Sequence, residues 1–410
     1  MRPGGGGRLL PASSSRGARL IVGARALRGF ADGLVSVLLA VHLTHVGLSP
    51  VQVGAVVTGT LLGSAALTLL VGLYGGRFAS RTILLAACAL MFGTGLGFAA
   101  ATAFVPLLLV AVLGTLNPSA GDVSVFLPVE QSHLAGEVSP HERPHLYARY
   151  NLAGALAGAV GALASGLTDV AGDRLGVDVV IVERVGFLVY ALVAVAAATI
   201  YRMLPRERGA GRSAIGRPLR SSRRIVLELA ALFSVDSAAS GLVVQSLLVL
   251  WLRLRFDLSV TGTATVFFAS GLLGAASQLL AGRVSARLGL VRAMVFTHLP
   301  ANALLIVAGL APTAPVAIGA LLLRALCSQM DVPARQAFVM AVVPPEERAA
   351  AASVTNVPRS LAAAATPLLG GQLLASGRLG WPLAIAGVAK IGYDLVLLRR
   401  FGSLAPDGDV

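Results

Sequence analysis

The chain has 410 residues, of which 56% are hydrophobic and only 13% carry charge, and its mean hydropathy is +0.81. Soluble domains carry about 25% charged residues, so this composition excludes an ordinary water-soluble domain. The net charge of +14 comes from arginine, apart from the single lysine Lys390. Because the arginines stand in short clusters between long apolar runs, they favour contact with membrane lipid over nucleic acid.

Apolar stretches long enough to cross a bilayer recur along the whole chain. A hydrocarbon layer about 30 Å thick needs roughly 20 apolar residues. Such stretches lie near 21–45, 51–73, 82–102, 105–135, 146–168, 184–203, 225–252, 260–281, 291–311, 314–343, 350–375 and 380–399. Because lipid cannot satisfy backbone polar groups, we expect them all to be helices. The sequence therefore predicts an all-α polytopic membrane protein with about twelve transmembrane helices; the fourth and tenth spans, which carry proline and charge, fit the pattern least.

An arginine-rich interruption divides the spans into two sets of six. Residues 202–224 contain eight arginines and one glutamate, which is typical of a solvated cytoplasmic loop. The predicted domains are a basic tail at 1–20, a six-helix bundle at 21–203, a linker at 204–224, a second six-helix bundle at 225–400 and a C-terminal tail at 401–410. The alternation of arginine-bearing loops predicts a multi-pass protein of the cell (inner) membrane, with both termini cytoplasmic.

The chain contains one polar stretch twice. Residues 128–151 recur at 333–356, with seven of 24 positions identical, most of them polar or proline. A second echo, 210 positions apart, pairs Gly72 with Gly282 and Arg77 with Arg287. Apolar coincidence does not explain matches of scarce polar residues, so the chain is predicted to consist of two parallel repeats of roughly 200 residues.

Twelve helices, two parallel repeats and a basic central loop resemble the major facilitator superfamily. Between its second and third helices that family writes G-x-x-x-D-R-x-G-R-[KR]. This chain keeps the glycine and the first arginine in both copies, Gly72 with Arg77 and Gly282 with Arg287, but replaces the aspartate by Gly76 and Ala286. The resemblance implies a transporter that works by alternating access, in which these four residues contribute to a gate. The alternative is that the arginines only anchor helix ends at lipid headgroups.

The repeated stretch also resembles the family's E-R signature at the entrance to helices 5 and 11. The first copy, Ser139 to Glu142, reads as a capping box with proline at the first helical position, and the second copy keeps only part of that box. The residues predicted to act at a cytoplasmic gate are Glu130, Gln131, Glu142, Arg143, Arg335, Gln336, Glu347 and Arg348. For Glu142 and Glu347 the alternative is helix capping alone. Arg143 and Arg348, which follow them, are predicted ion-pair partners.

Ionisable residues inside spans are costly and mark functional pathways. Asp32 in the first span and Asp236 in the seventh are predicted to bind a proton or a cation, since the resemblance implies that these helices line the cavity. The alternative for Asp32 is a structural pair with Arg28. The other predicted cavity residues are Asn117, Asp122, Gln245, Arg324 and Asp331. Lys390 and Asp394, four residues apart, are expected to neutralise each other.

Two further side-chain interactions are predicted in the fourth and tenth spans. Glu130 and Arg335 occupy equivalent repeat positions, 205 residues apart, so they are predicted to bridge the two halves. Arg324 and Asp331 share a helical face, so Arg324 either binds an anion or pairs with Asp331. Glycines recur in the fifth span at 154, 158, 161 and 166 and predict a close approach of another helix.

These patterns predict a secondary transporter rather than an enzyme. No Walker motif is present, and no cofactor is expected. His42 and His45 lack a third ligand nearby in the chain, so no metal site is expected. The predicted activity is proton-coupled export of a small organic or amphipathic solute by a monomer in the lipid bilayer. The alternatives are proton-coupled uptake and, in a different class, a membrane sensor that transports nothing.

Overall fold

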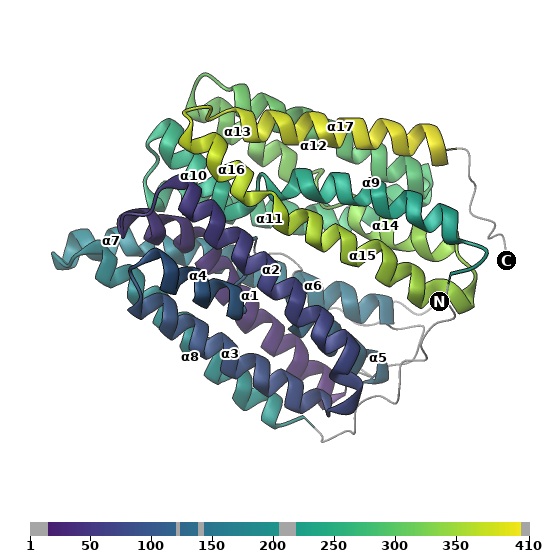
Figure 1. Ribbon diagram of the computed structural model, residues 1–410, viewed down its shortest axis with the longest axis horizontal. Helices are drawn as coiled ribbons and strands as arrows, with labels where there is room; N and C mark the ends of the chain where they lie inside the picture. Colours follow the sequence, from purple (N-terminus) through teal and green to yellow (C-terminus); the bar gives the residue numbers. More distant parts are fainter. Residues whose placement is uncertain (1–14, 120–123, 138–142, 205–218, 403–410) are drawn as a thin grey trace, which may run out of the picture.

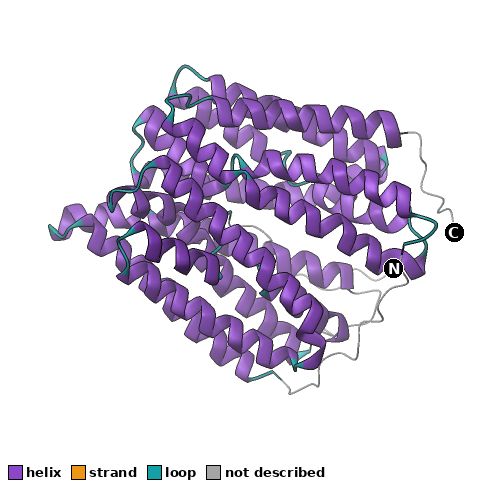
Figure 2. Cartoon of the chain, viewed as in Figure 1, coloured by secondary structure: helices purple, strands orange, loops and turns teal. Residues whose placement is uncertain are grey.

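The computed structural model describes residues 15–119, 124–137, 143–204 and 219–402, and the regular structure in these ranges is helical throughout (Figure 2). The first bundle contains α1 (Arg16–His45), α2 (Pro50–Tyr74), η1 (Gly75–Arg77), α3 (Ser80–Ala100), α4 (Phe104–Leu113), α5 (Phe126–Glu137), α6 (Arg143–Ser165), α7 (Leu167–Leu175) and α8 (Val179–Arg202). The second contains α9 (Arg223–Gly241), α10 (Gln245–Phe256), α11 (Val260–Leu288), α12 (Leu290–Leu310), α13 (Ala314–Ala325), α14 (Asp331–Ala341), η2 (Pro345–Glu347), α15 (Arg348–Ala365), α16 (Pro367–Ala375) and α17 (Trp381–Phe401).

These helices form two bundles of six spans, and the predicted fold class is confirmed. Five spans consist of two helices each: α4 with α5, α6 with α7, α9 with α10, α13 with α14, and α15 with α16. Within the described residues, nine helices are long and apolar enough to cross a membrane, and α4 and α13 are shorter apolar helices. The fourth and tenth spans, singled out for their proline and charge, are thus broken helices. Non-helical backbone at this depth is tolerated where protein or a cavity surrounds it.

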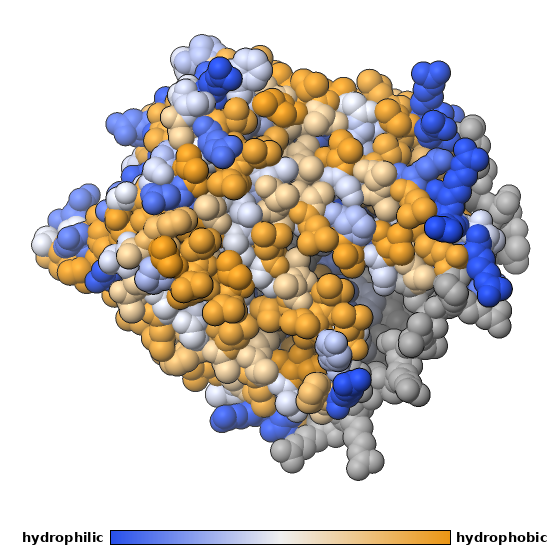
Figure 3. All heavy atoms as spheres, in the orientation of Figure 1, coloured by the Kyte–Doolittle hydropathy of each residue, from blue (hydrophilic) through white to orange (hydrophobic). Residues whose placement is uncertain are grey.

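An even number of spans brings the start of α1 and the end of α17 to the same end of the molecule (Figure 1). We call this the terminal end, and the opposite end, where His45 and Pro50 lie, the distal end. Large apolar side chains such as Leu69, Leu73 and Leu192 are exposed along the spans, and Figure 3 shows orange apolar surface over most of this face. Such a surface suits a lipid solvent.

Close backbone contacts hold the first bundle together. An added Cβ at Gly33 would collide with the carbonyl of Gly158, and one at Gly161 with the carbonyl of Phe30. Only glycine allows α1 and α6 to cross at this distance. The close approach predicted from the glycines of the fifth span is therefore confirmed, and its partner is α1.

Hydrogen bonds between the two bundles gather towards the distal end. Ser246 donates from Oγ to the carbonyl of Ser36 (2.7 Å) and from its backbone N–H to the carbonyl of Pro118 (3.1 Å). Thr261 Oγ1 donates to the carbonyl of Gly166 (2.8 Å), and the N–H of Leu368 donates to Thr58 Oγ1 (3.0 Å). In the described part of the chain, the hydrogen bonds between bundles lie from the middle of the spans outwards to this end. The bundles are thus closed distally, and Figure 3 shows a hollow between them towards the terminal end.

Candidate functional site

A charged network lies inside the first bundle, where α1, α5, α6 and α8 meet. The Glu130 carboxylate on α5 is fully buried and pairs with the guanidinium of Arg28 on α1. Tyr150 and Tyr201 donate their hydroxyl groups to the same carboxylate, each at 2.5 Å. Arg28 also donates from Nε to Tyr201 (3.1 Å) and lies 4.1 Å from the ring centroid of Phe126. Each polar group of this network therefore has a partner, as a buried ion pair requires.

A second network occupies the corresponding place in the second bundle. Asp236 on α9 accepts from Lys390 Nζ on α17 at 2.6 Å and pairs with Arg335 Nη1 on α14 at 3.5 Å. Arg335 Nη1 also lies 3.3 Å from Asp331, one turn earlier on α14. Next to these groups, the Asp394 carboxylate is held by His298 (3.0 Å) and Asn302 (2.9 Å). Asp236 and Arg335 are thus buried against partners of opposite sign, and the Asp394 carboxylate is buried and hydrogen-bonded.

The two networks are repeats of one another with the charges exchanged. In the first bundle the first span supplies the cation, Arg28, and the fourth span supplies the anion, Glu130. In the second bundle the first span supplies the anion, Asp236, and the fourth supplies the cation, Arg335. The predicted bridge between Glu130 and Arg335 is therefore wrong for this structure. Equivalent repeat positions face the first helix of their own bundle, and each charge is satisfied there.

The pair expected between Lys390 and Asp394 is also replaced. Lys390 points to Asp236, whereas Asp394 accepts from Asn302 and contacts His298. Spacing along one helix made the pair look self-sufficient, but a buried anion on a neighbouring helix lies closer. The sequence feature that could have indicated the partners of Asp394 is His298 with Asn302, two polar residues one turn apart inside an apolar span.

Asp32 lies beside the first network, one turn beyond Arg28, and its side chain is 7% exposed. The charges of Arg28 and Arg25 act on it, yet within the described residues its carboxylate makes no hydrogen bond. Arg28 is committed to Glu130, so the alternative reading of a closed Arg28–Asp32 pair is not what the structure contains. Asp32 is thus a buried carboxylate of the first span without a hydrogen-bond partner among the described residues.

The remaining predicted cavity residues lie near breaks in the spans. Asn117 sits between α4 and α5 and accepts from the N–H and hydroxyl of Ser119 (3.1 and 2.9 Å). Gln245 begins α10 and donates to Ser36 Oγ across the bundles at 2.8 Å. Arg324 ends α13; its Nε is buried without a hydrogen bond, and its charge interacts with Asp236 and Asp331. Asp122 lies outside the described residues.

The residues predicted to form a gate at the terminal end divide into two groups. Gly72 and Gly282 face open space, Arg287 and Gln336 are exposed, and Arg77 lies 5.4 Å from the ring of its neighbour Tyr74. The carbonyl of Gln131 accepts from Tyr147 at 3.0 Å. These contacts stay within one bundle, as expected if the molecule is open at this end. Glu142 and the side chain of Arg143 lie outside the described residues.

Glu347 and Arg348 do have defined partners, different from those expected. Glu347 accepts hydrogen bonds from the backbone N–H groups of residues 220, 221 and 222 (3.0 to 3.2 Å), so it holds the segment that leads into α9 rather than capping α15. Burial alone would raise the pKa of Glu347, but these N–H donors outweigh it and lower its pKa to about 2. Arg348 donates to the carbonyls of Met340 and Val343 (3.0 and 3.4 Å) instead of forming an ion pair.

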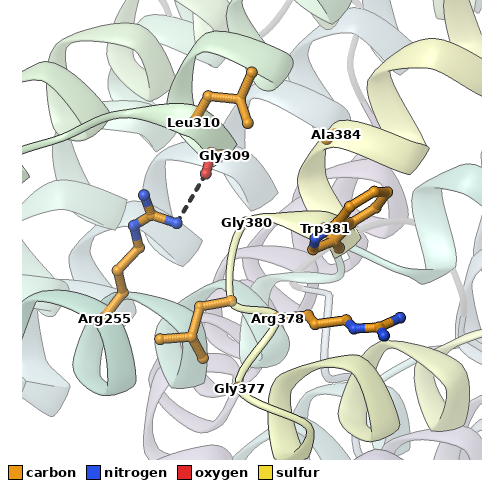
Figure 4. A pocket seen from close by; sticks show the side chains of 9 residues that line it. Arg255, Gly309, Leu310, Gly377, Arg378, Gly380, Trp381 and Ala384 are labelled. Carbon is orange, nitrogen blue, oxygen red and sulfur yellow. Dashed lines mark hydrogen bonds between the residues drawn. The ribbon is translucent and has the colours of Figure 1, made fainter.

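A surface pocket of about 400 Å³ lies elsewhere, at the distal end of the second bundle (Figure 4). Arg255 on α10 lines it and donates to the carbonyls of Gly309 and Ala311 at 3.0 and 2.8 Å. These are terminal carbonyls of α12, so Arg255 acts as a helix cap. The residues that line the pocket include none of the members of the two charged networks.

An all-helical membrane protein of two six-span bundles, with broken helices and balanced charges at mid-depth, has the architecture of a secondary transporter. The chain belongs to the Major Facilitator Superfamily, whose sequence pattern matches residues 21–326 and 227–401. The resemblance noted in the sequence is therefore confirmed.

Three known proteins illustrate this relationship. The uncharacterized membrane protein YJR124C of Saccharomyces cerevisiae is 25% identical over 95% of this chain and 94% of its own length. The crystal structure of the nucleoside transporter NupG superposes with a TM-score of 0.70 at 12% identity, covering 95% of this chain and 100% of that one. A bacterial homolog of the human lysosomal transporter Spinster, inward-facing and unoccupied, gives 0.67 at 16% identity, covering 95% and 96%. At these identities the two structures establish the fold alone.

Proposed function

We propose that this protein is a proton-coupled secondary transporter that exports a small organic or amphipathic solute by alternating access. One observation carries the proposal. The ion pairs Arg28–Glu130 and Asp236–Arg335 each lie within one bundle, while the hydrogen bonds between bundles in the described residues lie from mid-depth to the distal end. Two bundles joined at one end can rock about a site between them. The structure then corresponds to the state open at the terminal end.

The orientation of this state follows from the arginines. Residues 202–224, with eight arginines, join α8 to α9, whose adjoining ends lie at the terminal end, and basic loops favour the cytoplasmic side of a membrane. The proposal therefore places both termini in the cytoplasm, describes the structure as inward-open, and locates the chain in a cell (inner) membrane. We further propose that it acts as a monomer.

The solute site is proposed at mid-depth, where the fourth and seventh spans are broken. Asp32, Ser36, Asn117 and Gln245 supply the polar groups there, on spans whose other buried residues are mostly apolar. Few hydrogen-bonding side chains and one available carboxylate suit an amphipathic solute, in particular a cationic one, better than a sugar. Broken helices at this depth are where transporters of this architecture bind substrates.

Coupling is assigned to Asp32 and to the Asp236 network. A buried carboxylate that meets a different environment in each state can take a proton from one side and release it on the other. Asp32 has no hydrogen-bond partner in the described residues, whereas Asp236 contacts Lys390, Arg335 and His298 (2.6, 3.5 and 3.9 Å). In the proposed transport cycle, Asp32 is therefore the weakly paired acid and Asp236 the strongly paired one.

The test uses the purified protein in liposomes with a trapped pH indicator. Compounds that inhibit growth more strongly in a deletion strain are added one at a time, and solute-dependent proton movement is recorded. We expect Asp32→Asn to abolish coupled movement, while Glu228→Gln, at an exposed position (40%), retains it. Equal flux in Asp32→Asn and wild type would refute the assigned role of Asp32.

Export and uptake are distinguished by the direction of the pH gradient that drives accumulation of the solute. If the solute and proton move in opposite directions, the protein is an exporter; movement in the same direction makes it a symporter. A solute that binds and shifts the conformation without crossing the bilayer would instead identify a sensor.

A further inference from the structure

A cluster of two histidines and a glutamate at the distal end takes no part in the proposed coupling. Glu183, near the start of α8, is fully buried. Its Oε2 lies 3.0 Å from Nδ1 of His42 and its Oε1 lies 2.6 Å from Nδ1 of His45, both on the last turns of α1. The His42 side chain is fully buried, whereas that of His45 is 27% exposed. His45 is therefore the member of the cluster that the distal medium can reach.

His45 also touches the other bundle. Its Nε2 lies 3.2 Å from Nη2 of Arg253, on the last turn of α10. A guanidinium can only donate hydrogen bonds, so Nε2 must be the acceptor. Nδ1 then carries the hydrogen and donates it to Glu183. The contacts therefore assign one neutral tautomer to His45, and this tautomer joins the first bundle to the second.

No other charged group competes for the ring nitrogens of His45 in the described residues. The distal parts of α2, α6 and α11, which also pack against α1, contain no titratable side chain. On α8, Arg184 follows Glu183 and its Nε is buried without a hydrogen bond. On α10, Arg255 is engaged by the carbonyls of α12. His45 is thus placed between one anion, Glu183, and one cation, Arg253.

We propose that His45 is a proton-binding site that releases the distal contact between the bundles. Binding a proton at Nε2 removes the acceptor that Arg253 uses and places a second cation 3.2 Å from its guanidinium. The charged ring stays attached to Glu183, so the repulsion falls on the contact between bundles and not on the bundle itself. A histidine is suited to this role because its ordinary titration lies between about pH 5 and 8.

This latch rests on the proposed alternating access, since it describes how acid on the distal side favours the state open to that side. Its chemistry requires no knowledge of the solute. Loss of one hydrogen bond to a charged group corresponds to about a tenfold to hundredfold change in an equilibrium constant. Because His45 is partly exposed, we expect a change near tenfold in the ratio of open to closed molecules.

The experiment reads the conformation directly. Cys88 and Cys327 are replaced by alanine, and Ala264→Cys serves as the reporter because Ala264 is fully buried on α11 and faces Gly166 of the first bundle. The protein is placed in vesicles with the distal end outside and treated with a membrane-impermeant maleimide. Lowering the external pH from about 7.5 to about 5.5, across the ordinary range of histidine, should raise the labelling rate about tenfold.

Three substitutions decide whether His45 is responsible. His45→Gln, which can accept from Arg253 but cannot bind a proton, should label slowly at both pH values. His45→Arg, permanently cationic, should label fast at both. Arg253→Gln removes the repelled partner and should lose the pH response, which keeps the test decisive if a His45 variant folds poorly. His133→Gln, at the terminal end of α5, is the matched control and should respond like wild type.

Any of three results would overturn the latch: a reporter that ignores pH in wild type, a His45→Gln variant that still responds, or a His45→Arg variant that labels as slowly as wild type at neutral pH. None of these depends on flux. A protein that moves no solute can still show the labelling response, and a working transporter can lack it. Failure of the latch and failure of the proposed transport are therefore distinguishable.

Discussion

The buried pair of Arg28 and Glu130 makes a prediction that can be worked out from the structure. Glu130→Gln would leave the Arg28 guanidinium, 2% exposed, without its anion. It would also remove the carboxylate that accepts two tyrosine hydroxyl groups at 2.5 Å. Removing one partner of a buried pair costs about 3–5 kcal/mol. We therefore expect Glu130→Gln to lower the free energy of unfolding by about 3 kcal/mol or more.

The matched control is the exposed pair of Arg224 and Glu228, whose side chains are 90% and 40% exposed. An exposed pair is worth about 0–1 kcal/mol, so Glu228→Gln should be nearly silent. Both variants are unfolded with sodium dodecyl sulfate in mixed micelles, with helix content as the readout. The reasoning is refuted if the two substitutions cost the same within about 1 kcal/mol, the measured range of exposed pairs.

Charge exchange distinguishes the observed pairing from the one expected from the repeats. Arg28→Glu combined with Glu130→Arg should recover much of the stability that either change alone removes. Glu130→Arg combined with Arg335→Glu should recover none, because Glu130 and Arg335 belong to separate networks. Stability in mixed micelles and transport in liposomes are the two readouts. Rescue by the second exchange alone would show that the bridge between the bundles governs the fold.

Three further predictions concern other parts of the chain. The pKa of Glu347 is lowered to about 2, so its stabilising contribution is complete at neutral pH. This contribution is lost as the pH falls from the ordinary pKa of a glutamate towards 2. Glu347→Gln should therefore flatten the pH dependence of the free energy of unfolding over that interval. Gly33→Ala should destabilise the protein by about 1–3 kcal/mol by forcing α1 away from α6, while Gly23→Ala, which meets no atom within 4 Å, should change thermal unfolding little. Lys390→Met should show strong coupling to Asp236→Asn and near additivity with Asp394→Asn in double-mutant cycles, and the reverse result would restore the pair expected along α17.

The number and type of spans were readable from the sequence because the physics behind them is local. A run of about 20 apolar residues is enough to fill a bilayer, and its backbone can be satisfied only as a helix. The fourth span, noted for its proline and charge, was expected to be a helix, but α4 ends at Leu113 and α5 begins only at Phe126. The glycines of the fifth span predicted a close helix crossing, but they did not identify α1 as the partner helix.

The sequence did not predict which buried charges pair, because repeat symmetry allows more than one pairing. Glu130 and Arg335 are equivalent in the two repeats, and this equivalence fits two arrangements: contact with each other, or contact with the first helix of each bundle. Contact with the first helix of each bundle needs an oppositely charged partner there. Arg28 is that partner for Glu130, and Asp236 is that partner for Arg335. His45 and Glu183 show the same difficulty, since 138 residues separate two groups that lie 2.6 Å apart.

By itself the sequence determined the membrane solvent, the helical spans and the two repeats, since each follows from composition and spacing along the chain. Only the tertiary structure decided which buried charges meet, which end of the molecule is closed, and that Glu347 binds the segment leading into α9. These depend on how helices far apart in the chain cross. A buried charge takes whichever partner the crossing brings within hydrogen-bond distance, because leaving it unpaired costs several kcal/mol.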